Sequence, residues 1–192
     1  MVYVGDREEL SNILVNNNGD DIFSYEDKIL ELVPELIVCN KCEHNHIAHK
    51  NNNVYTHILD VVAGLDADLT LKLAALFHDI GKPYVKKKVN GNVHYWGHEE
   101  VSALIANLVL NRIGLDKSII NDVCTLIKIH DKKIKPTIND IKLVVDSIGK
   151  INFERLLRLQ RSDILSHADE YAEIIIPELD KLKEVYSNNK FR

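Results

Sequence analysis

An apolar run that ends in two adjacent polar residues constrains the fold of this chain more than any other feature. Residues 73–77 are apolar, His78 and Asp79 follow, and Gly81 and Pro83 come close behind. The run predicts the end of a buried helix, and the glycine and proline predict its termination. Neighbouring helical residues point about 100° apart, so both polar side chains can bind one metal ion only just beyond the helix. A divalent ion with mixed nitrogen and oxygen ligands explains the pair most simply.

Length and charge limit the class of protein. A chain of 192 residues predicts one domain, and three cysteines, an odd number, do not predict a disulfide framework. No stretch approaches the roughly 18 apolar residues of a membrane span, and the N-terminus lacks a signal pattern. We therefore expect a cytoplasmic protein with no membrane partner. The net charge of -5 argues against a general nucleic-acid binder, so any recognition of phosphate must be local, and we expect no sequence-specific DNA binding.

Apolar residues at helical spacing predict an all-α fold. We expect a core of about residues 30–168, an N-terminal helical extension over 1–25 and a C-terminal packing helix over 169–192. Ser24 with Asp27 is a capping-box signal that predicts a helix start. Residues 85–96 break the helical pattern: Asn90-Gly91 separates two β-prone runs there, which predicts a short β-hairpin.

Further histidines lie at the ends of predicted helices. His57 is at the edge of an apolar stripe, His98 is in the first turn after Gly97, and His130 ends another helix. Asp163 lies on an otherwise apolar helix face, where a carboxylate is unfavourable unless it is paired or bound to a metal. A lone histidine at a stripe edge is more often a buried core residue. Several at helix ends favour a metal site.

Two segments have more than one interpretation. Residues 39–49 contain Cys39, Cys42, His44, His46 and His49. Thiolates and imidazoles suit zinc, but structural zinc sites usually have a second ligand pair at a longer spacing. We interpret the segment as a polar loop beside the active site, with zinc as the alternative. Residues 86–88 are lysines, which form either a solvated face or a flap over a phosphate-bearing ligand. Tyr95 stacks on a base or packs the hairpin, and we expect Trp96 to pack.

His57, His78-Asp79 and Asp163, in this order, resemble the signature of the HD superfamily of metal-dependent phosphohydrolases. Four segments look like the HD domain of bacterial CCA-adding tRNA nucleotidyltransferases: LAALFHDIGKP (73–83), VHYWGHE (93–99), IKIHD (127–131) and LLRLQRSD (156–163). Residues 34–57 are similar too, and His49 matches a histidine eight positions before the first HD histidine. The chain has no counterpart of the paired catalytic aspartates of the nucleotidyltransferase domain, so we do not expect nucleotide addition.

The resemblance implies an HD-domain helical bundle that acts as a stand-alone hydrolase. Its activity would be that of a phosphatase or 2',3'-cyclic phosphodiesterase, using metal-activated water on the phosphate of a nucleotide or an RNA end. One alternative is a 5'-nucleotidase, a dNTPase or a dinucleoside polyphosphate hydrolase. The other is a non-catalytic module that binds a nucleotide or a partner.

The resemblance also implies roles for single residues. The metal ligands would be His57, His78, Asp79 and Asp163 for a first ion, with His98 and His130 completing a second that shares Asp79. The catalytic residues would be Asp79, Lys82 and His94, and the substrate-binding residues Lys82, His49 and Tyr95. Lys82 is alternatively a surface lysine at a helix end. One or two divalent ions are expected, and the ligand types admit Mn, Fe, Co, Ni, Zn or Mg.

Overall fold

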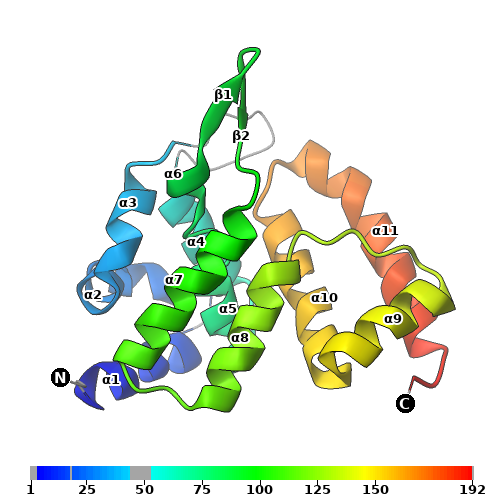
Figure 1. The fold of residues 1–192 in the computed structure, drawn as a ribbon, viewed down its shortest axis with the longest axis horizontal. Helices are drawn as coiled ribbons and strands as arrows, with labels where there is room; N and C mark the ends of the chain where they lie inside the picture. The colour runs from blue at the N-terminus through cyan, green and yellow to red at the C-terminus, as the bar shows by residue number, and fades with distance from the viewer. Residues whose placement is uncertain (1–3, 18, 44–52, 192) are drawn as a thin grey trace.

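The computed structural model describes residues 4–17, 19–43 and 53–191, and within them the protein is helical apart from one two-stranded sheet. Figure 1 shows the helices packed side by side, with the hairpin projecting from one end of the bundle. The N-terminal part consists of α1 (Val4–Asn16), the 3-10 helix η1 (Gly19–Tyr25), α2 (Glu26–Leu32), the 3-10 helix η2 (Pro34–Leu36) and α3 (Ile37–Asn40). The predicted all-α fold is confirmed.

Two helices form the centre of the bundle, α4 (Val54–Ala63) and α5 (Leu69–Phe77). Every residue of α5 after the first is buried, because α1, α4, α7, α8 and α10 all pack against it. Both helices begin at a capped residue: the side chain of Asn53 accepts from the N–H of Thr56, and that of Asp68 accepts from the N–H of Leu71. The helices packed around α5 fix its C-terminal end from several sides.

A hairpin follows the short helix α6 (Lys82–Val85). Strands β1 (Lys87–Val89) and β2 (Asn92–His94) pair antiparallel, with Val89 opposite Asn92. The turn residues Asn90 and Gly91 have φ values of 52° and 85°. Positive φ at both positions is what a two-residue hairpin turn requires, so the predicted hairpin is confirmed where Asn-Gly places it.

The remaining helices complete the bundle. Helices α7 (His98–Arg112) and α8 (Lys117–Ile129) lie side by side and antiparallel in Figure 1. After them come α9 (Ile138–Ile148), α10 (Lys150–Leu165) and α11 (Asp169–Ser187). Helix α10 packs against α4, α5 and α8, and α11 packs against α10. In the part of the chain that the structure describes, none of the helices has the length and apolar character needed to cross a membrane.

Two local predictions are wrong. Helix α2 does not begin at a Ser24 capping box: residues 19–25 form a 3-10 helix, and the N-cap is Tyr25, without a side-chain hydrogen bond. The carbonyl and N–H groups of this segment are used in 3-10 turns instead. Trp96 does not pack against the helices either, because 65% of it is exposed.

Candidate metal centre

The ends of five helices meet beneath the hairpin (Figure 1). Each contributes a side chain because α4 and α7 begin at this end, whereas α5, α8 and α10 finish there. The residues are His57 in the first turn of α4, His78 and Asp79 after α5, His98 at the start of α7, His130 after α8, and Asp163 near the end of α10. The structure thus brings together all six residues predicted as metal ligands.

One group of ligand atoms lies between α4, α5 and α10. Nε2 of His57 is 3.0 Å from Oδ1 of Asp163, and Nε2 of His78 is 3.8 Å from the same oxygen. Both histidines are fully buried. Three donor atoms from three helices therefore converge within 4.8 Å of one another, which is close enough to ligate a single ion.

Asp79 lies between this group and a second one. Its Oδ2 is 3.3 Å from Nε2 of His78 and 3.5 Å from Nε2 of His57. Its Oδ1 is 3.2 Å from Nε2 of His98 and 3.8 Å from Nε2 of His130. Each carboxylate oxygen thus faces a different pair of imidazoles, and the two pairs adjoin where the ring centroids of His78 and His130 lie 5.2 Å apart.

Hydrogen bonds to the backbone fix the orientation of three histidines. Nδ1 of His78 and Nδ1 of His130 each lie 2.7 Å from the carbonyl oxygen three residues earlier, and Nδ1 of His98 lies 3.0 Å from that of Tyr95. A carbonyl oxygen can only accept, so each Nδ1 carries the proton. When such a ring is neutral, its Nε2 carries the lone pair and faces the centre, which is how metal-ligating histidines are usually held.

The donor set fits a divalent metal ion. Nε2 of His78 and Oδ1 of Asp79 are buried and have no hydrogen-bond partner among the described residues, whereas Oδ2 of Asp79 is ion-paired with Lys82. Buried polar atoms without a partner are rare and unfavourable. Imidazole nitrogen and carboxylate oxygen are together the donors that divalent transition metals accept. These clusters could therefore hold a metal, whose identity the ligand types leave open.

The clustered carboxylates and imidazoles shift one another's pKa values. Burial favours the neutral acid, but His78 and Lys82 outweigh it and hold the pKa of Asp79 well below its usual range. Burial likewise opposes the charge on Asp163, yet a hydrogen bond from His57 and neighbouring histidines lower its pKa. Burial disfavours protonated His78, but the Asp79 carboxylate raises its pKa to about 9. Both carboxylates are thus ionised at neutral pH, as metal ligands must be.

Of the predicted catalytic and substrate-binding residues, Lys82 contacts Asp79 and Tyr95, whereas His94 lies on the hairpin. Nζ of Lys82 is 2.6 Å from Oδ2 of Asp79 and lies over the ring of Tyr95, 5.5 Å from its centroid. Lys82 is therefore part of the site and not an exposed lysine. His94 is on the hairpin, where its ring stacks on Trp96. His49 lies outside the described residues.

Sequence reasoning missed two residues of the centre. Asp131 forms a further group with His98 and His130, whose Nε2 atoms both lie 3.5 Å from its carboxylate oxygens. His167 contacts both Asp163 and the ring of His57. Two signals were present: His130-Asp131 repeats the pairing of His78-Asp79 at a helix end, and His167 is four residues after Asp163.

Neighbouring polar contacts hold the ligand-bearing turns. The N–H of Gly81 donates to Oγ of Ser102 at 2.8 Å, which joins the turn after α5 to α7. The side-chain amide of Gln160 donates to the carbonyl oxygens of His130 and Lys132 at 2.8 and 3.0 Å, which joins α10 to the end of α8. These bonds fix the distances between ligands that come from different helices.

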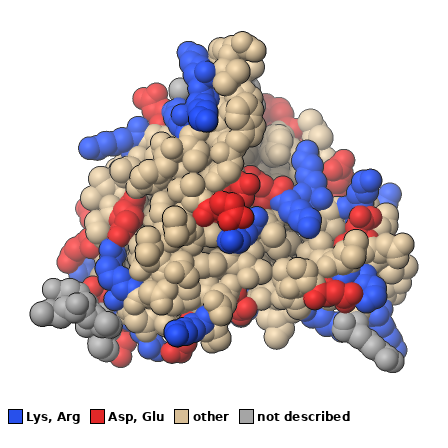
Figure 2. Space-filling model, viewed as in Figure 1, with Lys and Arg blue, Asp and Glu red and all other residues tan. Residues whose placement is uncertain are grey.

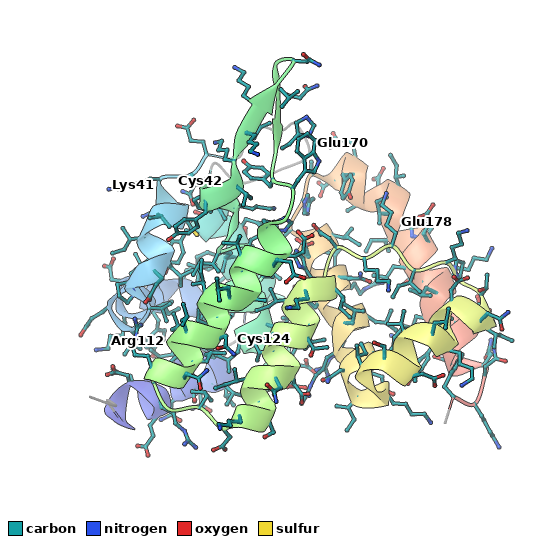
Figure 3. The ribbon with its side chains drawn as sticks, in the orientation of Figure 1. Lys41, Cys42, Arg112, Cys124, Glu170 and Glu178 are labelled. Carbon is teal, nitrogen blue, oxygen red and sulfur yellow. The ribbon has the colours of Figure 1, made fainter. Side chains whose placement is uncertain are left out.

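The cysteines are not among the clustered His and Asp side chains, although Cys39 lies close to the turn that carries Asp79. Cys39 is buried, its Sγ is 3.8 Å from the carbonyl oxygen of Ile80, and burial raises the pKa of its thiol. Figure 3 shows Cys42 and Cys124 far apart, and Cys124 donates to the carbonyl of Ala103. None of the possible metal-binding groups among the described residues includes a cysteine. The zinc alternative also involves His44 and His46, which lie outside the described residues.

Known proteins resemble this chain over the same region. The sequence pattern of the HD domain family matches residues 53–174. The CC-adding tRNA nucleotidyltransferase of Thermus thermophilus is 29% identical over 138 residues, which cover 65% of this chain and 30% of that protein. The A-adding tRNA nucleotidyltransferase of Deinococcus radiodurans is 34% identical over 67 residues, or 34% of this chain and 15% of that protein. The chain thus aligns with less than a third of either relative.

The family match covers more than half of the chain and includes every residue of the metal centre. The order of the ligands along the sequence and their meeting at one end of the bundle agree with it. The chain therefore belongs to the HD domain family.

Proposed function

We propose that this protein is a metal-dependent phosphohydrolase that acts on the phosphomonoester or 2',3'-cyclic phosphate of a nucleotide or RNA end. HD domains are in general metal-dependent hydrolases, and the His/Asp clusters could hold the metal. The observation that carries the proposal is the position of Asp79, whose two carboxylate oxygens face two separate pairs of histidines. This arrangement suits two ions that share one carboxylate.

The ligands divide between two positions in this proposal. His57, His78, Asp79 and Asp163 would hold one ion, and Asp79, His98 and His130 the other, with Asp131 as a further ligand. Divalent ions in such a site supply Lewis-acid chemistry: they neutralise phosphate oxygens and lower the pKa of water. The protein itself then needs no serine or cysteine nucleophile.

Lys82 supplies fixed positive charge at the phosphate. Burial lowers the pKa of a lysine, but Asp79 and Asp163 outweigh it and raise the pKa of Lys82. Its ammonium therefore stays charged at neutral pH. We assign it the role of orienting a phosphate oxygen and stabilising the charge that develops during displacement.

The substrate class is supported by the relatives. Both named relatives act on tRNA by their names, which makes a nucleotide or an RNA end the first class to test. Hydrolysis of a 5'-nucleotide, a dNTP or a dinucleoside polyphosphate is the enzymatic alternative, since the same ligands would serve it. A module that binds a nucleotide without hydrolysing it is the other alternative.

The test is hydrolysis of a panel of 2',3'-cyclic nucleotides, 2'-, 3'- and 5'-monophosphates, dNTPs and diadenosine tetraphosphate, with the products separated by chromatography, because opening a cyclic phosphate or cleaving the dinucleotide releases no inorganic phosphate. Each is assayed with Mn, Ni, Co and Mg. Asp79→Asn keeps the size of the side chain and should lower turnover more than about 100-fold. Even the loss of a residue that only hydrogen-bonds to a metal ligand lowers metal affinity or activity by about 10- to 100-fold. Asp116→Asn, at the far end of α8, is the matched control and should retain full activity.

The results separate the alternatives. Preferred turnover of cyclic or 2'-phosphates supports the proposal, and preferred turnover of dNTPs or the dinucleotide supports the enzymatic alternative. Equal activity of Asp79→Asn and the unmodified protein would contradict the assignment of the centre.

A further inference from the structure

The hairpin leaves a tryptophan uncovered beside the metal centre. Trp96 is 65% exposed, and its ring stacks on that of His94 with the centroids 4.2 Å apart and the planes 17° from parallel. Of the exposed aromatic side chains among the described residues, that of Trp96 is the most exposed, and its flat ring can stack on another ring. The pair presents a flat aromatic surface to solvent.

Positive charge lies on the same face of the hairpin. The strand register places Lys87 directly opposite His94, and cross-strand partners point to the same side of a sheet. Lys87 is exposed and has no carboxylate partner among the described residues, whereas the next residue of the strand, Lys88, points to the other face. Figure 2 shows basic side chains along one side of the projecting hairpin. Because the net charge of the chain is -5, the positive charge on the hairpin is local and does not reflect the overall composition.

The aromatic pair is connected directly to the metal centre. Trp96 precedes His98 by two residues, so their Cα atoms are at most about 7 Å apart. The carbonyl oxygen of Tyr95, which lies between His94 and Trp96 in the chain, also accepts the Nδ1 proton of His98. A ring stacked on Trp96 would therefore belong to a nucleotide close to the phosphate at the metal centre.

We propose that Trp96, His94 and Lys87 form a platform that binds an unpaired base and its adjoining backbone phosphate in a single-stranded oligonucleotide. The platform rests on the proposed function and names its substrate class, the unpaired end of a nucleic acid strand. Aromatic stacking combined with basic side chains along the backbone is how proteins bind single strands with little sequence preference. His94 then contacts the substrate as part of the platform and not as a proton donor.

Trp96 is the only tryptophan in the chain, so its fluorescence reports on the platform directly. The protein is titrated in EDTA, which prevents turnover, with a tetranucleotide of adenosine, its deoxy counterpart, a blunt-ended duplex and AMP. The single strands should quench the fluorescence to saturation, and the duplex should not. Quenching by RNA but not by DNA would show that the 2'-hydroxyl is also read.

Single-residue variants test which side chains of the platform contribute to binding of the single strand. The affinity for a dye-labelled tetranucleotide, measured by anisotropy, should fall at least about fivefold in Trp96→Leu, because stacking accounts for that much per base. Tyr25→Leu, an exposed aromatic on η1, is the matched control and should bind normally. Lys87→Gln should weaken binding and reduce its salt dependence by about one phosphate contact. Lys117→Gln, at the far end of α8, should change neither.

Two results would overturn the platform: no quenching by any single strand, or equal affinity of Trp96→Leu and the unmodified protein. Because binding is measured without metal or turnover, these results are independent of the hydrolysis assay. Turnover of mononucleotides together with no quenching would retain the proposed function and remove the platform alone.

Discussion

At the scale of single residues, the turn after α5 and helix α7 make a close backbone contact near the metal centre at Gly81. A Cβ atom there would lie 2.4 Å from the carbonyl oxygen of His98 and 2.7 Å from the backbone nitrogen of Ser102. The turn after α5 and the start of α7 touch through this glycine, and no larger residue fits without moving one of them. The distance between Asp79 and His98 thus depends on the absence of a side chain.

We expect Gly81→Ala to push the turn away from α7. Overpacking of this kind destabilises a protein by about 1–3 kcal/mol, and moving His98 away from Asp79 should weaken metal binding. Thermal melting and calorimetric titration with Mn measure the two effects. Gly5→Ala is the control, because nothing lies within 4 Å of its added Cβ. Unchanged metal affinity in Gly81→Ala would show that the centre tolerates movement of α7.

Single residues of the centre were predictable to different degrees. Histidines at helix ends are visible in the sequence because apolar periodicity locates the ends. Asp131 is 60% exposed and follows a helix end, so no apolar face marks it. His94 is close to His98 in the chain, but side chains alternate along a strand, and proximity in sequence does not give their direction.

At the scale of elements, the start of α5 is held by charge as well as by packing. Asp68 caps the helix and also accepts hydrogen bonds from Arg155 and Arg158 of α10, at 2.9 and 3.0 Å. Burial raises the pKa of this carboxyl, but the hydrogen bonds from Arg155 and the Leu71 N–H outweigh it, and the pKa lies below its usual range. The ion pairs join the helix that carries His78 to the helix that carries Asp163.

We expect Asp68→Asn to lower the free energy of unfolding by about 1 kcal/mol at pH 7, the upper end for partly exposed pairs. Asparagine still caps the helix, so the change removes the charge alone. The lowered pKa means that this stabilisation is complete above about pH 4 and is lost as the pH falls through the folded-state pKa. Urea unfolding at several pH values measures it. Asp146→Asn, in an exposed pair with Lys142, should change little. A difference between Asp68→Asn and the unmodified protein that persists at low pH would contradict the ionic explanation.

Elements were predictable where local chemistry decides them. The Asn90-Gly91 turn depends on the conformational freedom of two adjacent residues, so the hairpin could be placed from sequence. The start of α2 could not, because Ser24 competes with a 3-10 helix whose stability depends on Ile22 being buried in the core. A capping signal alone does not reveal whether Ser24 caps α2 or lies within a 3-10 helix.

At the scale of the whole molecule, the proposed metal ligands come from five helices. An ion that binds them stabilises the folded state alone, and at a concentration 100 times its dissociation constant it contributes about 2.7 kcal/mol. For a chain of this size, that raises the melting temperature by about 5–11 °C. Calorimetry with and without EDTA measures the shift. Asp79→Asn should show little of it, and an equal shift in that variant would point to metal binding elsewhere.

The arrangement of whole helices was the least predictable feature from pattern alone. His57 and Asp163 are more than 100 residues apart in the chain, yet their side chains are in contact. Periodicity predicts which face of a helix is buried, but not which helix covers it. Only the order of the motifs, through its resemblance to a family, indicated that these two residues meet.

The spread of the ligands along the chain also determines when the centre can form during synthesis. His57, His78, His98 and His130 leave the ribosome before Asp163, which lies on α10. Until α10 has emerged, the nascent chain carries a cluster of imidazoles and the carboxylate of Asp79 without its last ligand. We therefore expect the position that includes Asp163 to load only after α10 has docked, whereas the proposed ligands of the other position all precede α10 in the chain. The order in which the two positions fill would then follow the order of synthesis.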